Sequence, residues 1–92
     1  MIIGCTGNYR KEEYYSILNK VYTILGKTDS KLLISSDLEK NPNFQIPSAY
    51  NIMDFSQVAD TCDILFAIGG DGTILSTVRR LEQKMKPIMG IH

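Results

Sequence analysis

Long runs of one charge, long apolar stretches and clusters of metal-binding side chains are all missing from this sequence of 92 residues. Ten basic and ten acidic residues give a formal net charge of zero, and no run of like charges occurs. Nucleic acids and anionic membranes bind through clustered positive charge. The sequence therefore gives no reason to expect either as the main partner.

No segment has the pattern of a targeting signal or a membrane span. The first ten residues, MIIGCTGNYR, contain neither a basic leader nor a long apolar stretch, so they do not read as a signal peptide. Nowhere is an apolar segment long enough to cross a bilayer. We therefore expect a cytoplasmic protein.

Cysteine and histidine are also scarce, with two and one in the chain, and no C-x-x-C motif occurs. This scarcity argues against a structural zinc site, and we predict no metal-ligating residue. Cys5 and Cys62 fall in or beside predicted strands. There they are expected to be small buried apolar residues in a reducing compartment.

The composition that is present suits one small globular domain. Hydrophobic residues make up 43% of the chain, which is enough for a core and argues against disorder. Short apolar runs predict four strands, at residues 1–5, 31–35, 63–68 and 87–91. The third of these runs, DILFAI, is almost wholly apolar, as is typical of a strand covered on both faces.

Between the strands, apolar residues recur at three- and four-residue spacing and predict two amphipathic helices. The first starts after Arg10, with Asn8 as its N-cap and Gly26 as its C′ residue. The second starts near Gly72. Its inner face is predicted to contain Ile74, Leu75, Val78, Leu81 and Met85.

The intervening segment predicts less regular structure. Asparagine, proline and serine make residues 41–48 a loop, and the apolar residues that follow are expected to pack on the body without forming a long element. Asp54 and Gln57 resemble a capping pair that opens a short helix.

Strands that alternate with helices predict right-handed βαβ units. The fold class expected for residues 1–92 is therefore a three-layer α/β/α, Rossmann-like domain with a parallel sheet of about four strands. Because the last predicted element is an apolar strand with no helix after it, we expect the domain to be incomplete.

The most informative stretch is GGDGT at residues 69–73, between a predicted strand and a helix, where ligands gather in parallel sheets. Gly69 and Gly70 can adopt positive φ and let another molecule approach the backbone. Free amides at the helix start favour phosphate oxygens, and the Thr73 hydroxyl can cap the helix or bond a phosphate. The spacing matches neither G-x-G-x-x-G nor G-x-x-x-x-G-K-[ST], which disfavours a dehydrogenase and a P-loop NTPase.

Asp71 stands inside this loop, and a carboxylate there repels phosphate unless something compensates. It either helps to hold Mg²⁺ that carries the nucleotide, or accepts a proton from an attacking hydroxyl. Both roles fit phosphoryl transfer. The structural alternative is that Asp71 caps the helix while the glycines form a tight turn.

The stretch DILFAIGGDGTILSTVRR, followed by KPIMGIH, resembles the N-terminal domain of the ATP- or polyphosphate-dependent NAD kinases, over roughly residues 60–92. In that family an apolar strand leads into GGDGT, a helix with an arginine near its middle follows, and the next strand reads close to P-I-x-G-I-[NH]. Diacylglycerol and sphingosine kinases share GGDGT but usually continue with Asn-Glu, where this chain has Ile74 and Leu75. A lipid kinase is the second hypothesis, and a non-catalytic domain for packing or partner binding is the third.

The resemblance implies transfer of the γ-phosphoryl group of ATP, or of polyphosphate, to the adenosine 2′-hydroxyl of NAD⁺ with Mg²⁺ or another divalent cation. It implies that Asp71 accepts the proton and that the Gly72 backbone contacts the dinucleotide. Gly69, Gly70 and Thr73 would shape the phosphate loop. Arg79 matches the helix arginine of the family and is a weaker candidate for binding phosphate.

The family also has a β-rich C-terminal domain that supplies most of the NAD site, and its members are usually oligomers. The resemblance thus implies a homo-oligomer at full length and an inactive 92-residue piece. Arg10 and Lys11 follow the first strand and are candidates for contacts with ATP phosphates, with ordinary surface charge as the alternative. His92 is expected at the crevice end of its strand, without a catalytic role.

Overall fold

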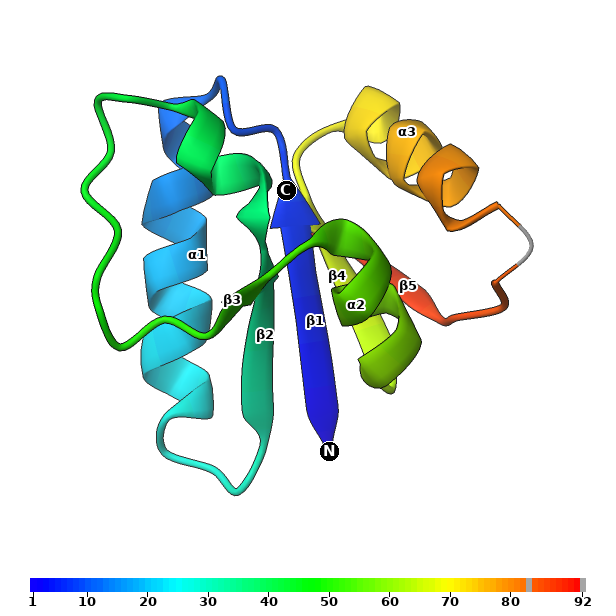
Figure 1. Cartoon of the computed structure of the whole chain (residues 1–92), viewed down its shortest axis with the longest axis horizontal. Helices are drawn as coiled ribbons and strands as arrows, with labels where there is room; N and C mark the ends of the chain where they lie inside the picture. The colour runs from blue at the N-terminus through cyan, green and yellow to red at the C-terminus, as the bar shows by residue number, and fades with distance from the viewer. Residues whose placement is uncertain (83, 92) are drawn as a thin grey trace.

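A parallel sheet of five strands organises the computed structural model, which describes residues 1–82 and 84–91. The strand order is β3-β2-β1-β4-β5, and each neighbouring pair is parallel. The strands are β1 (Ile2–Gly7), β2 (Lys31–Ser35), β3 (Ile52–Met53), β4 (Ile64–Ile68) and β5 (Ile88–Ile91) (Figure 1). The predicted parallel α/β architecture is confirmed.

The sheet has one strand more than the four that the apolar runs predict. The additional strand is β3, whose two residues pair with Ile34 and Ser35 of β2. A two-residue strand is too short to show any alternation, so periodicity could not reveal it. The same segment contains the 3₁₀ helix η1 (Ser36–Lys40), which the sequence pattern also did not predict.

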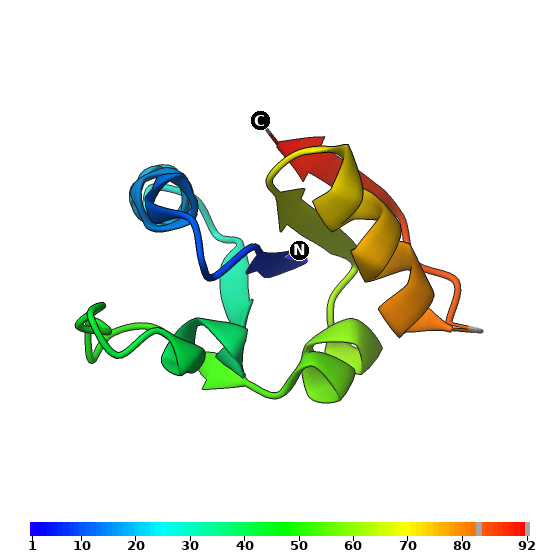
Figure 2. The same ribbon diagram turned by 90° about the horizontal axis from the view of Figure 1, so that it is seen from above.

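Helices cover both faces of the sheet, as the three-layer prediction requires (Figure 2). One face carries α1 (Glu12–Leu25), over a core cluster that includes Cys5 and Ile34. On the other face α2 (Phe55–Thr61) and α3 (Asp71–Leu81) pack over a second cluster, which includes Cys62. Both cysteines are buried, as predicted, and neither forms a disulfide.

The predicted ends of α1 are not the observed ones. Lys11 is the N-cap residue, and its side chain makes no capping hydrogen bond. The Asn8 side chain instead accepts a hydrogen bond from the Arg10 amide at 3.1 Å, in the turn before the helix, so the prediction of Asn8 as N-cap is wrong. Gly26 follows the helix with a φ of −63°, which is right-handed, so it does not form the left-handed end expected of a C′ glycine.

The short helix α2 begins where the sequence predicts. Asp54 is its N-cap residue, and its Oδ1 accepts a hydrogen bond from the Gln57 amide at 2.8 Å. This bond satisfies one of the free amides of the first turn.

The predicted inner face of α3 is largely wrong. Three members of the predicted stripe are exposed: Leu75 at 58%, Val78 at 49% and Met85 at 94%. The buried residues of the helix are Thr77 and Leu81. Thr77 faces inward because its hydroxyl donates to the Thr73 carbonyl at 2.8 Å, which satisfies its polar atom within the helix. A count of apolar residues alone overlooks such a threonine.

The strand order creates a crevice between the carboxyl ends of β1 and β4. After β1 the chain crosses to the face that carries α1, and after β4 it crosses to the face that carries α3. Neighbouring strands whose connections diverge in this way leave an open crevice, where ligands bind in sheets of this type. Among the described residues, none of the helices is long and apolar enough to span a membrane.

Candidate functional site

Two cavities open at this crevice, one on each face of the sheet. The large crevice cavity, of about 620 Å³, lies between α3, η1 and the chain that follows β1, and its wall includes Arg10, Asp37, Lys40 and Arg80. The small crevice cavity, of about 250 Å³, lies on the α1 side and includes Lys11. The first volume falls within the range of small-molecule sites.

The glycine loop between β4 and α3 forms part of both cavities. Gly69 has a φ of +146°, and a Cβ at this position would lie 2.5 Å from the Thr73 hydroxyl oxygen. Only glycine fits such a conformation without strain. Gly70 is the extended N-cap residue of α3, and together with Gly72 it lines the large crevice cavity. The positive end of the α3 dipole therefore lies at the edge of that cavity.

Gly72 is in a different situation. A Cβ built at this position meets no atom within 4 Å, so packing within the described residues does not require a glycine. Thr73, the next residue, lines both cavities, and its amide donates to the Gly70 carbonyl at 3.0 Å. The space over Gly72 is therefore open to a molecule from outside.

Asp71 is the first residue of α3 and is exposed. Because Gly70 is the N-cap residue, the structural alternative in which Asp71 caps the helix is not what the structure shows. Gly70 and Gly72, on either side, line the large crevice cavity, whereas Asp71 itself is not among the residues of its wall. Its side chain is exposed to solvent beside the crevice.

The two arginines of α3 lie in different surroundings. Arg79, the candidate from the sequence, is exposed and belongs to the wall of neither crevice cavity, whereas Arg80 lines the large one. Arg10 and Lys11, the other candidates, line the large and the small cavity, respectively. His92 lies outside the described residues.

Sequence reasoning missed Asp37, Lys40 and Arg80, which the fold brings together at the large crevice cavity. Asp37 and Lys40 belong to η1, an element with no recognisable pattern. A usable signal did exist in α3, because its polar residues Thr73, Ser76, Thr77 and Arg80 follow helical spacing and line the cavity together.

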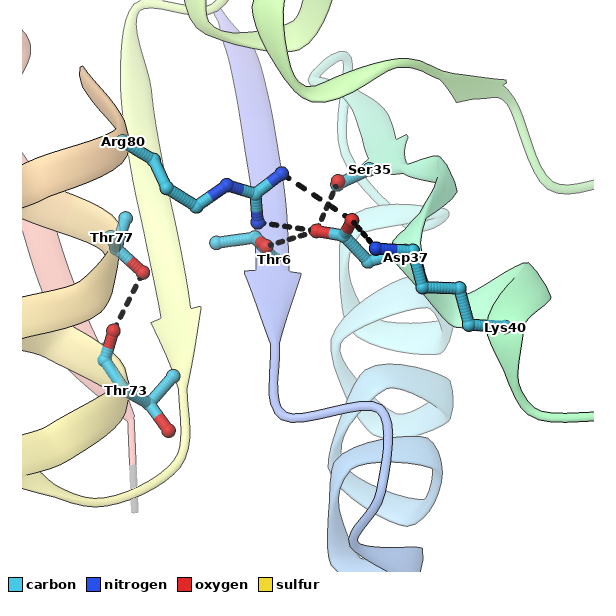
Figure 3. Close-up of polar contacts among 7 residues, drawn as sticks. All are labelled: Thr6, Ser35, Asp37, Lys40, Thr73, Thr77 and Arg80. Atoms are coloured by element: carbon cyan, nitrogen blue, oxygen red, sulfur yellow. Dashed lines mark hydrogen bonds and ion pairs between the residues drawn. The ribbon is translucent and has the colours of Figure 1, made fainter. Parts of the chain in front are cut away.

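Asp37 is the centre of a polar network (Figure 3). Its Oδ2 accepts hydrogen bonds from Arg80 Nη1 at 2.5 Å and from the Ser35 hydroxyl at 2.9 Å, while Arg80 Nη2 donates to Oδ1 at 3.3 Å. The Thr6 hydroxyl lies 3.5 Å from Oδ2, and Lys40 Nζ lies 3.7 Å from Oδ1. Both terminal nitrogens of Arg80 thus donate to the carboxylate, and this bidentate arrangement is the strongest for such a pair.

The charges of this network leave the large crevice cavity positive. Burial of the Asp37 side chain, which is 11% exposed, disfavours its charged form. The hydrogen bonds from Arg80 and Ser35, together with the charges of Arg80 and Lys40, outweigh burial and lower the pKa of Asp37 below its ordinary value of 3.8. One carboxylate therefore faces three cationic groups in the wall, those of Arg10, Lys40 and Arg80.

The described residues do not build a metal site of their own. They contain no group of three or more histidine, cysteine, aspartate or glutamate side chains placed to hold an ion. The Asp37 carboxylate is occupied by Arg80. Asp71, exposed beside this crevice, is the carboxylate that would help to hold a divalent cation, together with oxygens of a bound phosphate compound and of water.

Comparison with known proteins points to one family. The family model described as the ATP-NAD kinase N-terminal domain matches residues 3–92. An NAD kinase of Helicobacter hepaticus is 51% identical over 39 residues, which is 42% of this chain and 13% of that protein. An NAD kinase of Methylibium petroleiphilum is 31% identical over 86 residues, 94% of this chain and 28% of that protein, and one of Polaromonas naphthalenivorans is 27% identical over 90 residues, 98% of this chain and 30% of that protein. The chain thus spans less than a third of the length of these relatives.

Proposed function

The chain belongs to the family of ATP-NAD kinase N-terminal domains, and from this we propose that its protein phosphorylates NAD⁺ to NADP⁺. The observation that carries the proposal is the glycine loop at residues 69–73. It lies at the switch point of the sheet, beside a cavity whose wall contains Arg10, Lys40 and Arg80, and it contains the exposed carboxylate of Asp71.

The donor is proposed to bind with its phosphates in the large crevice cavity. The start of α3 offers backbone amides there, and Arg10, Lys40 and Arg80 supply positive charge. ATP is the donor we propose, with polyphosphate as the alternative, since both present the same chain of phosphate groups. Mg²⁺ or another divalent cation would arrive with those phosphates and neutralise part of their charge.

Asp71 is proposed as the general base. In the reaction the 2′-hydroxyl oxygen of the adenosine ribose bonds to the γ-phosphorus, and the bond from that phosphorus to the ADP oxygen breaks. The hydroxyl proton passes to the Asp71 carboxylate, which faces solvent and is free of hydrogen bonds to the rest of the described chain. Gly72 is proposed to contact the dinucleotide through its backbone, in the open space above it.

The remaining parts of the proposal concern the whole protein. Because the relatives are more than three times as long as the matched region, we expect the 92-residue chain alone to be inactive as a kinase. We propose a cytoplasmic homo-oligomer. We also propose that Gly69, Gly70 and Thr73 shape the loop that binds the nucleotide phosphates, and that Arg79 is a further candidate for binding phosphate. A lipid kinase is the less favoured alternative, since the family match covers nearly all of the chain.

The test is Asp71→Asn in the protein expressed from its complete gene. Loss of a general base is expected to lower the rate of NADP⁺ formation by about 100-fold or more, since positioned bases contribute about 10²–10⁴-fold. NAD⁺ binding and the circular dichroism spectrum should be unchanged, because the exposed Asp71 side chain supports no packing. Turnover is measured by the appearance of NADP⁺, coupled to a dehydrogenase specific for NADP⁺.

Asp29→Asn is the matched control, because it makes the same chemical change at an exposed turn far from the crevice. Near-normal turnover of Asp71→Asn would show that the carboxylate is not the base. A wild-type protein that binds neither ATP nor NAD⁺ would favour the third hypothesis, a non-catalytic domain.

A further inference from the structure

We propose that Asp37 is a positioning residue, which holds the guanidinium of Arg80 in the large crevice cavity so that Arg80 binds the phosphates of the donor. This inference rests on the proposed function and adds to it a residue pair outside the glycine loop. The two residues are 43 positions apart, and they meet across the carboxyl end of β1 (Figure 3).

Arg80 is held in place from two directions. Asp37 accepts hydrogen bonds from both terminal nitrogens, at 2.5 and 3.3 Å. The guanidinium carbon also lies 3.9 Å from the centre of the Phe55 ring, at the start of α2. Cation–π stacking and a two-pronged hydrogen bond together leave the planar group little freedom to rotate.

Arg80 also keeps hydrogen-bond donors for a ligand. An arginine guanidinium has five N–H groups and Asp37 takes two, so up to three remain. The Arg80 side chain is 39% exposed, and the residue belongs to the wall of the cavity. A fixed guanidinium with free donors in a cavity is suited to the tetrahedral oxygens of phosphate.

The Asp37 carboxylate is itself fixed in position. Asp37 is anchored independently of Arg80, because the Ser35 hydroxyl donates to it at 2.9 Å from the end of β2. The rigid sheet thus determines where the carboxylate lies, and the carboxylate determines where the long Arg80 side chain ends. A group fixed in advance binds its ligand without first losing side-chain entropy.

A purely structural role is the competing explanation, in which Arg80 only neutralises a buried charge. The two explanations differ in one measurable way. If Asp37 only stabilises the fold, replacing it lowers stability and leaves donor binding by the folded protein unchanged. If Asp37 positions Arg80, donor affinity changes while NAD⁺ affinity does not.

The experiment compares Asp37→Asn, Asp37→Glu and Arg80→Lys in the protein expressed from its complete gene. We expect Asp37→Asn and Arg80→Lys to raise the KM for ATP about tenfold or more, the usual effect of losing a charge-assisted hydrogen bond. The KM for NAD⁺ should stay within about twofold of wild type, since the proposed role of the pair is to bind the phosphates of the donor. Asp37→Glu should recover part of the affinity because it retains the carboxylate.

Asp60→Asn is the matched control. It removes a carboxylate of the same kind, which pairs with Lys84 at 2.8 Å on the exposed surface of α2, away from both crevice cavities. Its KM for ATP should equal that of wild type. If the control shifts as much as Asp37→Asn does, the effect is general electrostatics and the positioning role is refuted.

A second measurement separates this inference from the proposed function. Binding of inorganic tripolyphosphate, followed by titration calorimetry, needs neither NAD⁺ nor turnover, and we expect Asp37→Asn and Arg80→Lys to weaken it about tenfold as well. Unchanged tripolyphosphate affinity in both variants overturns the inference, whatever the enzyme phosphorylates. Failure of the wild type to make NADP⁺ would instead overturn the proposed function.

If Asp37→Asn does not fold, the KM for ATP and the KM for NAD⁺ are measured for Ser35→Ala and Arg80→Lys instead. Ser35→Ala removes one hydrogen bond from Asp37 and leaves the pair itself in place. The expected result is a smaller rise in the KM for ATP, of about threefold, at unchanged KM for NAD⁺. No rise in either variant would show that the network does not serve the donor.

Discussion

Gly72 is a glycine that the fold of the described chain does not need. Its φ is not in the left-handed region, and an added Cβ would meet open space. Glycine costs helix stability because its unfolded state has more conformational freedom than that of alanine. A residue that weakens α3 without a packing reason is explained if a ligand approaches its backbone, as the proposed function requires.

This reasoning predicts opposite effects of Gly72→Ala on stability and activity. The free energy of unfolding should rise by about 0.5–1 kcal/mol, because alanine favours a helix over glycine. NADP⁺ formation should fall by about tenfold or more, because the methyl group would occupy the space in which the proposed function places the dinucleotide. Urea denaturation and steady-state kinetics measure the two effects.

Gly26→Ala is the control for this experiment. Gly26 also has a right-handed backbone, at the far end of α1, and an alanine Cβ there would lie 3.3 and 3.5 Å from the carbonyl oxygens of Tyr22 and Thr23. Its activity should match that of wild type. Full activity in Gly72→Ala would remove the argument for a backbone contact at this position.

At the residue scale, local chemistry made the loop predictable and tertiary contact made its surroundings unpredictable. The conformation of Gly69 follows from a motif of five adjacent residues, since its φ is positive as that motif allows. The pairing of Asp37 with Arg80 depends on how η1 lies against α3, which no spacing within one element records. Arg79 and Arg80 are neighbours in sequence, and only the rotation of α3 about its axis distinguishes them.

Among the elements, α2 is the one whose start rests on a single side chain. Asp54 accepts the Gln57 amide at 2.8 Å, and the helix has only seven residues over which to share its stabilising contacts. We expect Asp54→Ala to lower the free energy of unfolding by about 1 kcal/mol, the usual value of an N-cap. Urea denaturation at neutral pH is the measurement.

The control is Asp29→Ala, which removes a carboxylate from an exposed turn that caps no helix. It should alter the unfolding free energy by less than about 0.5 kcal/mol, as is common for surface positions. Equal losses in the two variants would mean that the Asp54 cap contributes nothing specific.

Element types could be predicted wherever periodicity spans several residues. Four strands follow from apolar runs, two helices from helical spacing and a third from the Asp54–Gln57 capping pair, with boundaries correct to within a few residues. The face of α3 could not be predicted, because Thr77 and Leu81 pack inward while the more apolar Leu75 and Val78 face outward. The surface against which α3 packs, here β4 and β5, determines which of its residues face inward. That surface exists only in the folded molecule.

At the scale of the whole molecule, the Asp37–Arg80 pair connects η1 with α3 across the carboxyl end of β1. Asp37 follows β2 and Arg80 belongs to the helix after β4, so the pair links the connections on either side of β1. Because the folded state lowers the pKa of Asp37, the ionised carboxylate stabilises the fold. That contribution is complete above the unfolded pKa, about 4, and is lost as the pH falls through the folded value.

We therefore expect the difference in unfolding free energy between wild type and Asp37→Asn to depend on pH. It should be largest at pH 5–7 and should shrink as the pH falls below about 4, where Asp37 becomes protonated in the unfolded chain, until the pH passes through the lowered native pKa. Urea denaturation of both proteins at a series of pH values measures the difference. A difference that stays constant from pH 7 to pH 3 would contradict an ionised, paired Asp37.

The two cysteines lie in different layers of the molecule. Cys5 belongs to the core cluster beneath α1, and Cys62 belongs to the cluster beneath α2 and α3. Burial raises the pKa of both thiols. Little of the reactive thiolate form of either cysteine therefore exists while the helices that cover it are packed on the sheet. The rate at which an alkylating reagent modifies each sulfur consequently reports the opening of one side of the sheet, and the natural chain contains a separate chemical reporter for each side.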